Sequence, residues 1–327
     1  MVTKKLTLVQ AINQALRHEM EKNPDMVLLG EDIGLDGGVF RTTEGLIDQF
    51  GDNRVVDTPL SESGIVGVAI GMAAYGLTPV VEIQFMGFLY GAMEQLISHA
   101  ARLRTRTQGR YTCPIVVRSP YGGGIHAPEL HSESTEALFI HTPGLKVVTP
   151  STPAEAKGLL LSSIRDPDPV IFLEPARIYR AIKEEVPEGE YLIPLGKART
   201  LMEGKDITLI TWGAMVHPVL KAADRMAMEG VEAEVIDLRT LSPLDIETLL
   251  CSVKKTGRAV IVHEAPRSCG LGAEISALLC EEALDALEAP VLRVTGFDTP
   301  FPLPKMEKYY LPDVDQIVET IETVVGY

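Results

Sequence analysis

Glu62 is the acidic residue whose surroundings in the sequence most suggest a chemical role. It lies between two serines, after a strand-like run that ends at Pro59 and before the small-residue segment Gly64–Ala74. This order predicts a strand, a turn and a tightly packed helix, with Ser61 or Ser63 as the N-cap. A carboxylate at this position can stabilise the first helical turn or serve in a functional site, and the position alone leaves both interpretations open.

A glycine-rich loop, residues 121–133, carries two histidines that can exchange protons. Gly122, Gly123 and Gly124 permit positive φ angles and close backbone approach, as the loops of active sites require. His126 and His131 follow, and histidine titrates near neutral pH. A histidine on such a loop is also often a solvated surface side chain, so the pattern keeps both interpretations.

Two further candidates stand at the end of the predicted strand Thr78–Phe85. Gln84 has an amide that can bind a ligand or satisfy loose backbone groups at the strand's end. Phe88 opens a predicted helix that runs from Phe88 to Thr107, and it is either a core aromatic or a ring that faces a ligand.

Several common catalytic signatures are absent from the sequence. No G-x-G-x-x-G follows a strand, and neither G-x-x-x-x-G-K-[ST] nor G-x-S-x-G occurs. The four cysteines form no close pair and no zinc-like spacing, which indicates reduced thiols. A nicotinamide dehydrogenase, an NTPase or a zinc protein is therefore poorly supported.

The composition is that of a globular protein with an acidic second half. The 327 residues are 46% hydrophobic and 23% charged, with a net charge of −15. Residues 184–327 carry 25 Asp and Glu against 13 Lys and Arg, a net of −12, whereas residues 1–183 carry 20 against 17, a net of −3. This charge argues against nonspecific nucleic-acid binding, and an acidic domain can select a basic partner. Because no long apolar run and no signal core are visible, we expect a cytoplasmic protein.

Strand-like and helix-like segments alternate twice along the chain. The first alternation ends with the strand Pro169–Pro175, and the second begins at Ile207. Proline, glycine and charged residues separate them. We therefore predict an α/β fold with two domains, each with a mostly parallel sheet flanked by helices: a first domain at 1–180, a linker at 181–205 and a second domain at 206–327.

Short stretches along the whole chain are similar to those of one family, in the same order and without large gaps. They are Gly30–Asp32, Gly37–Arg41, Asp57–Glu62, Glu82–Phe85, Arg118–Pro120, His131–Ser132, Gly204–Thr208 and Phe297–Pro300. The chain resembles the beta subunit of the thiamine-diphosphate-dependent first component of 2-oxo acid dehydrogenase complexes. The resemblance implies a thiamine-diphosphate pyrimidine-binding domain and then a transketolase C-terminal-like domain, in an α2β2 heterotetramer.

The resemblance also implies roles for single residues. Glu62 would hydrogen-bond the aminopyrimidine of thiamine diphosphate and favour its imino tautomer, for which a carboxyl of raised pKa in an apolar setting is suited. His131 would donate a proton and orient the substrate, with His126 as a weaker candidate. The residues expected near the cofactor ring are Leu60, Gln84 and Phe88, and Leu60 would add to the apolar setting.

Half of such a site is missing from this chain. The Gly-Asp-Gly motif that holds magnesium and the diphosphate in this family is absent, so an alpha subunit should supply it and the chain should be active only with that partner. Ser163, Asp166 and Asp168 match a loop that binds a structural monovalent cation, potassium, in some relatives. The sequence Asp-Pro-Asp-Pro is also ordinary turn chemistry.

The implied reaction is the oxidative decarboxylation of a 2-oxo acid with acyl transfer to the lipoyl-lysine of the second component, an acyltransferase. Pyruvate is slightly favoured over branched-chain 2-oxo acids, and acetoin cleavage is a further alternative. A docking subunit with a decayed site is a different class, but the presence of Glu62 and His131 argues against it. The acidic C-terminal domain is expected to dock the acyltransferase. The helical stripe Gly64, Gly67 and Gly71 implies either a subunit contact or packing within the domain.

Overall fold

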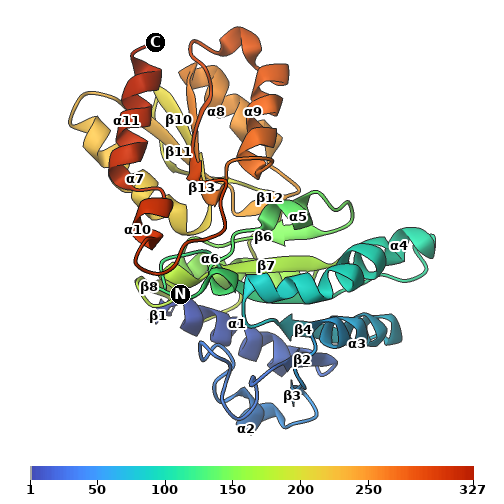
Figure 1. Cartoon of the computed structure of the whole chain (residues 1–327). Helices are drawn as coiled ribbons and strands as arrows, with labels where there is room; N and C mark the ends of the chain where they lie inside the picture. The colour runs from blue at the N-terminus through green and yellow to red at the C-terminus, as the bar shows by residue number, and fades with distance from the viewer. Residues whose placement is uncertain (1) are drawn as a thin grey trace. The chain divides into compact units, whose positions relative to one another are not determined.

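The computed structural model describes residues 2–327, which divide into two compact units (Figure 1). Unit 1 comprises the chain up to Tyr121 together with Leu138–Leu195, and unit 2 comprises Gly122–Ala137 together with Gly196–Tyr327. The boundary after Leu195 lies inside the predicted linker. Residues 122–137 group with unit 2, whereas the predicted first domain is one continuous range, 1–180. The predicted domain limits remain a prediction.

A parallel sheet forms the centre of unit 1. Its strands follow the order β6-β7-β5-β4-β2-β3, and each is parallel to its neighbours. β2, β5 and β7 are buried along their whole length, as expected where helices cover both faces of a sheet. The strands are β2 (Met26–Gly30), β3 (Val55–Asp57), β4 (Thr78–Glu82), β5 (Val116–Tyr121), β6 (Lys146–Val148) and β7 (Val170–Pro175).

The helices of unit 1 begin where sequence signals place them. In α1 (Leu8–Lys22) the predicted capping box is present: Gln10 N donates to Thr7 Oγ1 at 3.3 Å, and Thr7 N donates to Gln10 Oε1 at 3.0 Å. This helix packs against α6 (Pro153–Ile164), while α3 (Glu62–Tyr75) packs against β4. A separate antiparallel pair joins β1 (Thr3–Thr7) to β8 (Lys183–Pro187). The shorter helices are α2 (Leu46–Phe50), α4 (Leu103–Arg106) and, at the boundary of the two units, α5 (Glu136–Ile140).

The segment predicted as one helix from Phe88 to Thr107 is helical up to Arg106, but it is not a regular α-helix. It consists of the 3-10 helix η1 (Met86–Ala92), the π-helical η2 (Gln95–His99), the 3-10 helix η3 (Ala100–Arg102) and α4. Two glycines in η1 weaken a regular helix, and the Gln95 side chain reaches toward α3. There a Cβ at Gly67 would lie 3.3 Å from Gln95 Oε1. Short π-helical turns are frequent at functional sites.

Unit 2 contains a second, mostly parallel sheet in the order β14-β13-β10-β11-β9, in which only the edge pairing of β9 with β11 is antiparallel. α7 and α11 pack against each other, and Asp313 forms a capping box at the start of α11. The predicted α/β fold with two mostly parallel sheets is confirmed. The strands of this sheet are β9 (Arg199–Met202), β10 (Ile207–Thr211), β11 (Ala233–Asp237), β13 (Ala259–Pro266) and β14 (Leu292–Gly296), and β12 (Thr240–Ser242) is not part of it. The helices are α7 (Val216–Ala227), α8 (Ile246–Thr256), α9 (Leu271–Glu282), α10 (Glu307–Tyr310) and α11 (Val314–Val325).

Among residues 2–327, no helix combines the length and the apolar character that a membrane crossing requires. The four cysteines form no disulfide; Cys113 is buried, and the other three are exposed.

Candidate active site

The carboxyl ends of three strands bring Glu62 and Gln84 to one edge of the unit 1 sheet. β2, β3 and β4 are parallel neighbours, with Gly30 opposite both Asp57 and Glu82. Glu62 follows the end of β3 as the first residue of α3, and Gln84 lies two residues beyond β4. Because open α/β sheets bind ligands outside the carboxyl ends of their strands, this edge is the expected place for a site.

Glu62 presents a half-buried carboxylate that forms no hydrogen bond or ion pair with other described side chains or backbone groups of the chain. Ser61 occupies the N-cap position, but its side chain makes no capping hydrogen bond. A Cβ at Gly91 would lie 3.4 Å from Glu62 Oε2, so glycine leaves room beside the carboxylate. A carboxylate in the first turn of α3 suits the helix dipole and is still available to a ligand.

Two more acidic residues lie at the same edge, directly after β2. Burial, followed by the nearby charges of Glu62 and Asp32, raises the pKa of the Glu31 carboxyl. Gln84 Nε2 donates a hydrogen bond to Asp32 Oδ2 at 2.9 Å, so its amide is held by a carboxylate rather than by loose backbone groups. The sequence predictions missed Glu31 as part of this cluster, although its place directly after a buried strand was a usable signal.

Phe88 belongs to a row of aromatic rings. Its ring meets the Phe85 ring edge-on at 5.7 Å, Phe85 meets Phe40 at 5.6 Å, and Phe40 tilts against Tyr179 at 4.9 Å. Phe88 is half-buried, so one part of its ring packs inside unit 1 and the rest is accessible. Leu60, in contrast, is 78% exposed and provides no apolar cover for Glu62 within this chain.

Buried charged side chains form a network within the sheet of unit 1. Arg118 on β5 binds Glu82 at 2.9 Å and Glu174 at 2.7 Å, and all three side chains are almost completely buried. The Tyr179 hydroxyl donates to Glu174 at 2.5 Å, and the Thr42 hydroxyl donates to Glu82 at 2.8 Å. Burial lowers the pKa of Arg118, but the two carboxylates outweigh it and leave that pKa raised. Charges at the ends of buried strands were visible in the sequence, yet their pairing was not predicted.

In unit 2, Glu307 holds the loop that precedes His131. Its carboxylate is 2% exposed and accepts hydrogen bonds from the backbone N–H groups of Gly124 and His126, the second at 3.0 Å. The ring of His126, which is 76% exposed, adds its Nδ1 at 3.0 Å. No sequence pattern indicates this contact, because Glu307 lies far along the chain in the short helix α10.

The glycines of this loop are required by its conformation, as predicted. Gly122 and Gly124 have φ angles of 84° and 95°. A Cβ at Gly123 would lie 2.5 Å from the Phe301 ring, and one at Gly122 would lie 2.2 Å from a Glu264 oxygen, so no other residue fits.

The predicted site residues are divided between the two units. Leu60, Glu62, Gln84 and Phe88 belong to unit 1, while His131 ends the 3-10 helix η4 (Glu129–His131) of unit 2 and is half-buried. The structure brings Glu62, Gln84 and Phe88 to one sheet edge, because η1 packs against α3. The pairing of His131 with Glu62 remains a prediction.

The predicted cation loop has its carboxylates occupied by basic side chains. Lys146 Nζ binds Asp166 at 2.5 Å, and Arg104 Nε binds Asp168 at 2.7 Å. Ser163 Oγ donates to the carbonyl of Leu159 at 2.7 Å. No group of three or more His, Cys, Asp or Glu residues suited to a metal ion occurs among the described residues. The paired carboxylates do not favour a further cation, and no step below uses one.

Comparison with known proteins identifies the two domains. Residues 4–181 match the family described as the pyrimidine binding domain of transketolase, and residues 196–317 match the transketolase C-terminal domain. Among solved structures, a split-gene transketolase described as an inactive beta4 tetramer has a TM-score of 0.81 at 22% identity and covers 98% of both chains. A transketolase mutant from Pichia stipitis has a TM-score of 0.69 at 15% identity and covers 99% of this chain and 46% of its own. These structures support the fold alone.

Curated sequences are much more similar. The pyruvate dehydrogenase E1 component subunit beta of Bacillus subtilis is 52% identical over 98% of this chain and 99% of its own length. The protein of the same name from Staphylococcus aureus is 50% identical with the same coverage. The resemblance stated from short stretches is confirmed, and the chain belongs to the family of pyruvate dehydrogenase E1 component beta subunits.

Proposed function

We propose that this chain is the beta subunit of a thiamine-diphosphate-dependent pyruvate dehydrogenase first component, active only with an alpha subunit. The observation that carries the proposal is the Glu62 carboxylate, which has no partner within the described chain at the ligand-binding edge of a pyrimidine-binding domain. The names of relatives that are 50–52% identical over nearly the whole chain support it.

When bound, thiamine diphosphate would supply a nucleophilic carbon and an electron sink for the decarboxylation of a 2-oxo acid. In this mechanism Glu62 would share a proton with the pyrimidine ring. Phe88 packs against the ring, and Gln84, held by Asp32, fixes its orientation. His131 donates a proton to the substrate and orients it.

The alpha subunit is proposed to hold magnesium and the diphosphate in an α2β2 heterotetramer. Part of the surface of unit 1 suits such a partner: Val68 and Tyr75 of α3 are 54% and 88% exposed, and Leu60 just before this helix is 78% exposed. A Cβ at Gly71 would meet nothing within 4 Å, so this side of the helix can receive another subunit. Leu60 would then gain the apolar surroundings that it lacks here.

The reaction proposed is oxidative decarboxylation of pyruvate with acetyl transfer to the lipoyl-lysine of the acyltransferase, which docks on the acidic C-terminal domain. A cytoplasmic location belongs to the same proposal. Structural potassium gains no support from Asp166 and Asp168, whose carboxylates are already paired.

The test is a substrate panel on this chain co-purified with its alpha subunit. Pyruvate should give the highest kcat/KM for dye reduction, above branched-chain 2-oxo acids and acetoin. A preference of about tenfold or more for a branched-chain acid or acetoin would replace pyruvate in the proposal. Absence of thiamine-dependent turnover with every substrate would favour a docking subunit with a decayed site.

A further inference from the structure

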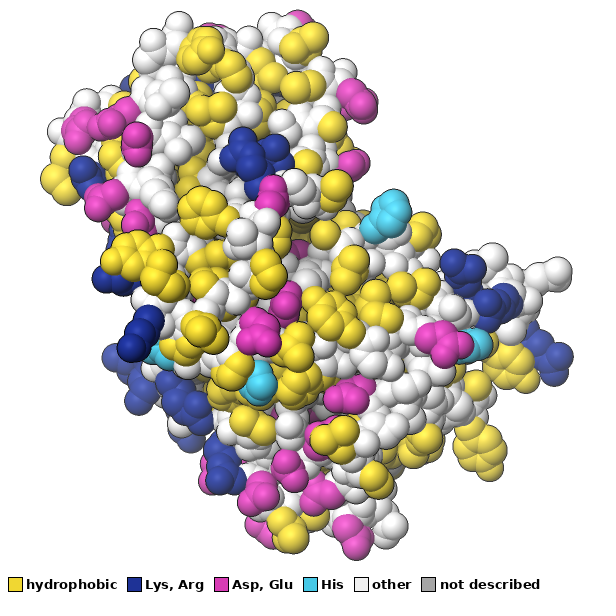
Figure 2. All heavy atoms as spheres, viewed as in Figure 1, with side chains coloured by type: hydrophobic (Ala, Val, Ile, Leu, Met, Phe, Trp, Pro, Cys, Tyr) yellow, Lys and Arg dark blue, Asp and Glu magenta, His cyan; other side chains and the backbone are white. Residues whose placement is uncertain are grey.

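A broad groove in unit 1 is lined by basic side chains although the chain as a whole is acidic. Its cavity of about 820 Å³ is in the range of small-molecule sites, which is about 300–1,000 Å³. The charged residues that line it are Lys4, Arg17, Arg41, Arg180, Lys183 and a single acid, Glu44. Five positive charges against one negative charge contrast with the net −15 of the whole chain. In Figure 2, Lys and Arg side chains gather over the area of β1 and β8.

None of these five cations forms an ion pair within residues 2–327. Elsewhere in the chain some exposed basic side chains have acidic partners, as Lys205 has Glu232 and Arg225 has Asp315. Unpaired like charges around one cavity raise its positive potential and attract an anion. No residue of the proposed active site lines this groove.

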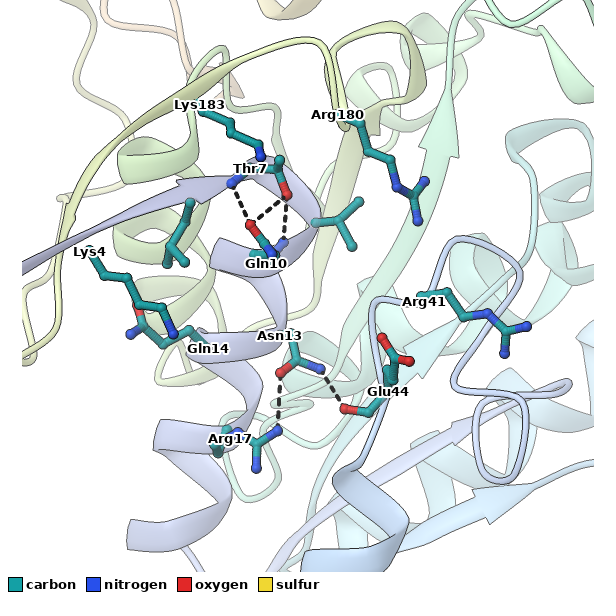
Figure 3. Close-up of a pocket in the computed structure, with 12 residues that line it drawn as sticks. Lys4, Thr7, Gln10, Asn13, Gln14, Arg17, Arg41, Glu44, Arg180 and Lys183 are labelled. Atoms are coloured by element: carbon teal, nitrogen blue, oxygen red, sulfur yellow. Dashed lines mark hydrogen bonds between the residues drawn. The ribbon is translucent and has the colours of Figure 1, made fainter.

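Polar contacts of the protein fix the shape of the groove. Asn13 on α1 donates to the backbone carbonyls of Thr42 at 2.9 Å and Glu44 at 3.1 Å, and Arg17 donates to Asn13 at 3.3 Å (Figure 3). Arg180 donates to the carbonyl of Phe40 at 2.7 Å. The helix α1, the turn that contains Glu44 and the segment after β7 are therefore joined around the cavity.

Arg41 provides a second, independent observation. Its φ angle is 66°, in the left-handed region that non-glycine residues seldom adopt. Such a conformation is strained for a residue with a Cβ, and strained residues are frequent in ligand sites. The strain presents an exposed guanidinium at the groove while the neighbouring Phe40 carbonyl binds Arg180.

We propose that this groove binds a small polyanion of the polyphosphate type. Three of the five cations are arginines, whose planar forks match phosphate oxygens in pairs. The cavity is larger than one phosphate requires, and the five charges enter it from β1, α1, the turn after Phe40 and the segment that leads into β8. A linear anion with several charges can meet more of them than a single ion can.

The test is titration calorimetry with inorganic tripolyphosphate, on this chain alone and on the assembly with its alpha subunit. The double variant Lys4→Gln/Lys183→Gln removes two side chains that make no hydrogen bond or ion pair with the described residues, so folding should be retained. Affinity should fall about tenfold or more, because charge-assisted contacts are lost. The matched variant Lys221→Gln/Lys254→Gln removes the same charge from exposed sites of unit 2 and should change affinity less than about twofold.

Several outcomes would overturn the proposal: no binding to the wild-type chain, or equal losses in the two double variants. Binding to the isolated chain that disappears on assembly would assign the groove to an acidic segment of the partner. Equal affinity for a tetraglutamate peptide would remove the preference for phosphate. Competition by thiamine diphosphate would show that the groove is not separate from the active site. The proposed function would stand in each of these cases.

Discussion

At the scale of single residues, the Glu62 carboxylate can both stabilise the start of a helix and interact with a cofactor. Glu62 lies in the first turn of α3, where a negative charge stabilises the helix by about 0.3–1 kcal/mol. That contribution does not require a hydrogen bond, so the carboxylate can interact with a ligand at no structural cost. An amide at this position would keep the shape of the side chain and lose the proton that catalysis shares.

Glu62→Gln should therefore lower turnover by roughly 100-fold or more while the protein folds normally, since acid–base groups contribute about this much. The measurement is kcat for pyruvate in the assembled enzyme, with circular dichroism as the check on folding. Glu281→Gln, an exposed glutamate on α9, is the matched control and should leave kcat unchanged. Turnover of Glu62→Gln within about twofold of wild type would refute the role of Glu62.

A second residue, His263, makes stability depend on pH. Burial, reinforced by the charge of Arg293, lowers the pKa of His263 to about 4, and its ring stacks on Trp212 at 5.1 Å. In the unfolded chain the pKa of histidine is about 6.5. Between these values His263 is protonated in the unfolded chain and neutral in the folded chain. The free energy of unfolding therefore falls as the pH drops from about 6.5 to 4, by about 3 kcal/mol at most.

His263→Gln should remove this part of the pH dependence, although it lowers stability at pH 7. Urea unfolding of the chain at several pH values between 7 and 5 measures the slope. His141→Gln, at an exposed position, should keep the slope of the wild type. Identical slopes for wild type and His263→Gln would contradict the assignment.

At the scale of elements, local patterns predicted most of the fold, and contacts between distant segments account for what they missed. The strands β4 and β7 and the start of α3 follow from local patterns, and the sequence located them. The helical segment after Phe88 is irregular where it packs against α3. Local propensity does not predict the effect of such a contact. In the same way Glu62 and Gln84 could be placed at strand ends, whereas the buried network of Arg118 and the clamp of Glu307 join residues far apart in the chain.

The clamp leads to a prediction for the loop that precedes His131. Glu307→Ala removes the acceptor of two partly buried backbone N–H groups, which costs about 1 kcal/mol of local stability. Hydrogen exchange of residues 122–137 should become faster, and kcat should fall about tenfold because His131 is less well positioned. Glu307→Gln keeps one acceptor oxygen and should recover part of both effects.

The control for this prediction is Glu281→Ala, which removes an exposed carboxylate from the same unit. It should change neither hydrogen exchange of residues 122–137 nor kcat. Unchanged exchange in Glu307→Ala would show that the loop holds its conformation without the clamp.

At the scale of the whole molecule, the acidity of the second half predicts where the acyltransferase docks. Complementary charge speeds encounter, and exposed charges are screened beyond about 8–10 Å at physiological salt. Residues beyond Asp313 are unsuitable for deletion, because Ile317, Val318 and Ile321 of α11 lie in the core of unit 2. Exposed acids on this helix provide a better test.

If the acyltransferase docks here through a small basic domain, as the family resemblance implies, Glu319→Lys/Glu322→Lys should slow association with that domain, and added salt should reduce the difference from wild type. Both glutamates are exposed on α11. Stopped-flow mixing of that domain with the heterotetramer from low to high salt measures the rate. The matched variant Asp48→Lys/Asp52→Lys changes charge equally in unit 1 and should have a smaller effect. Equal effects of the two variants would place the docking surface elsewhere.

In the proposed enzyme, this chain supplies one half of a thiamine site and a separate alpha subunit supplies the other. The most direct measurement is the release of carbon dioxide from pyruvate by this chain alone, by the alpha subunit alone and by the two together, each with thiamine diphosphate and magnesium. We predict release only from the mixture, because no Gly-Asp-Gly motif for the diphosphate occurs in this sequence. Release at the full rate from this chain alone would contradict the division of the site between two subunits.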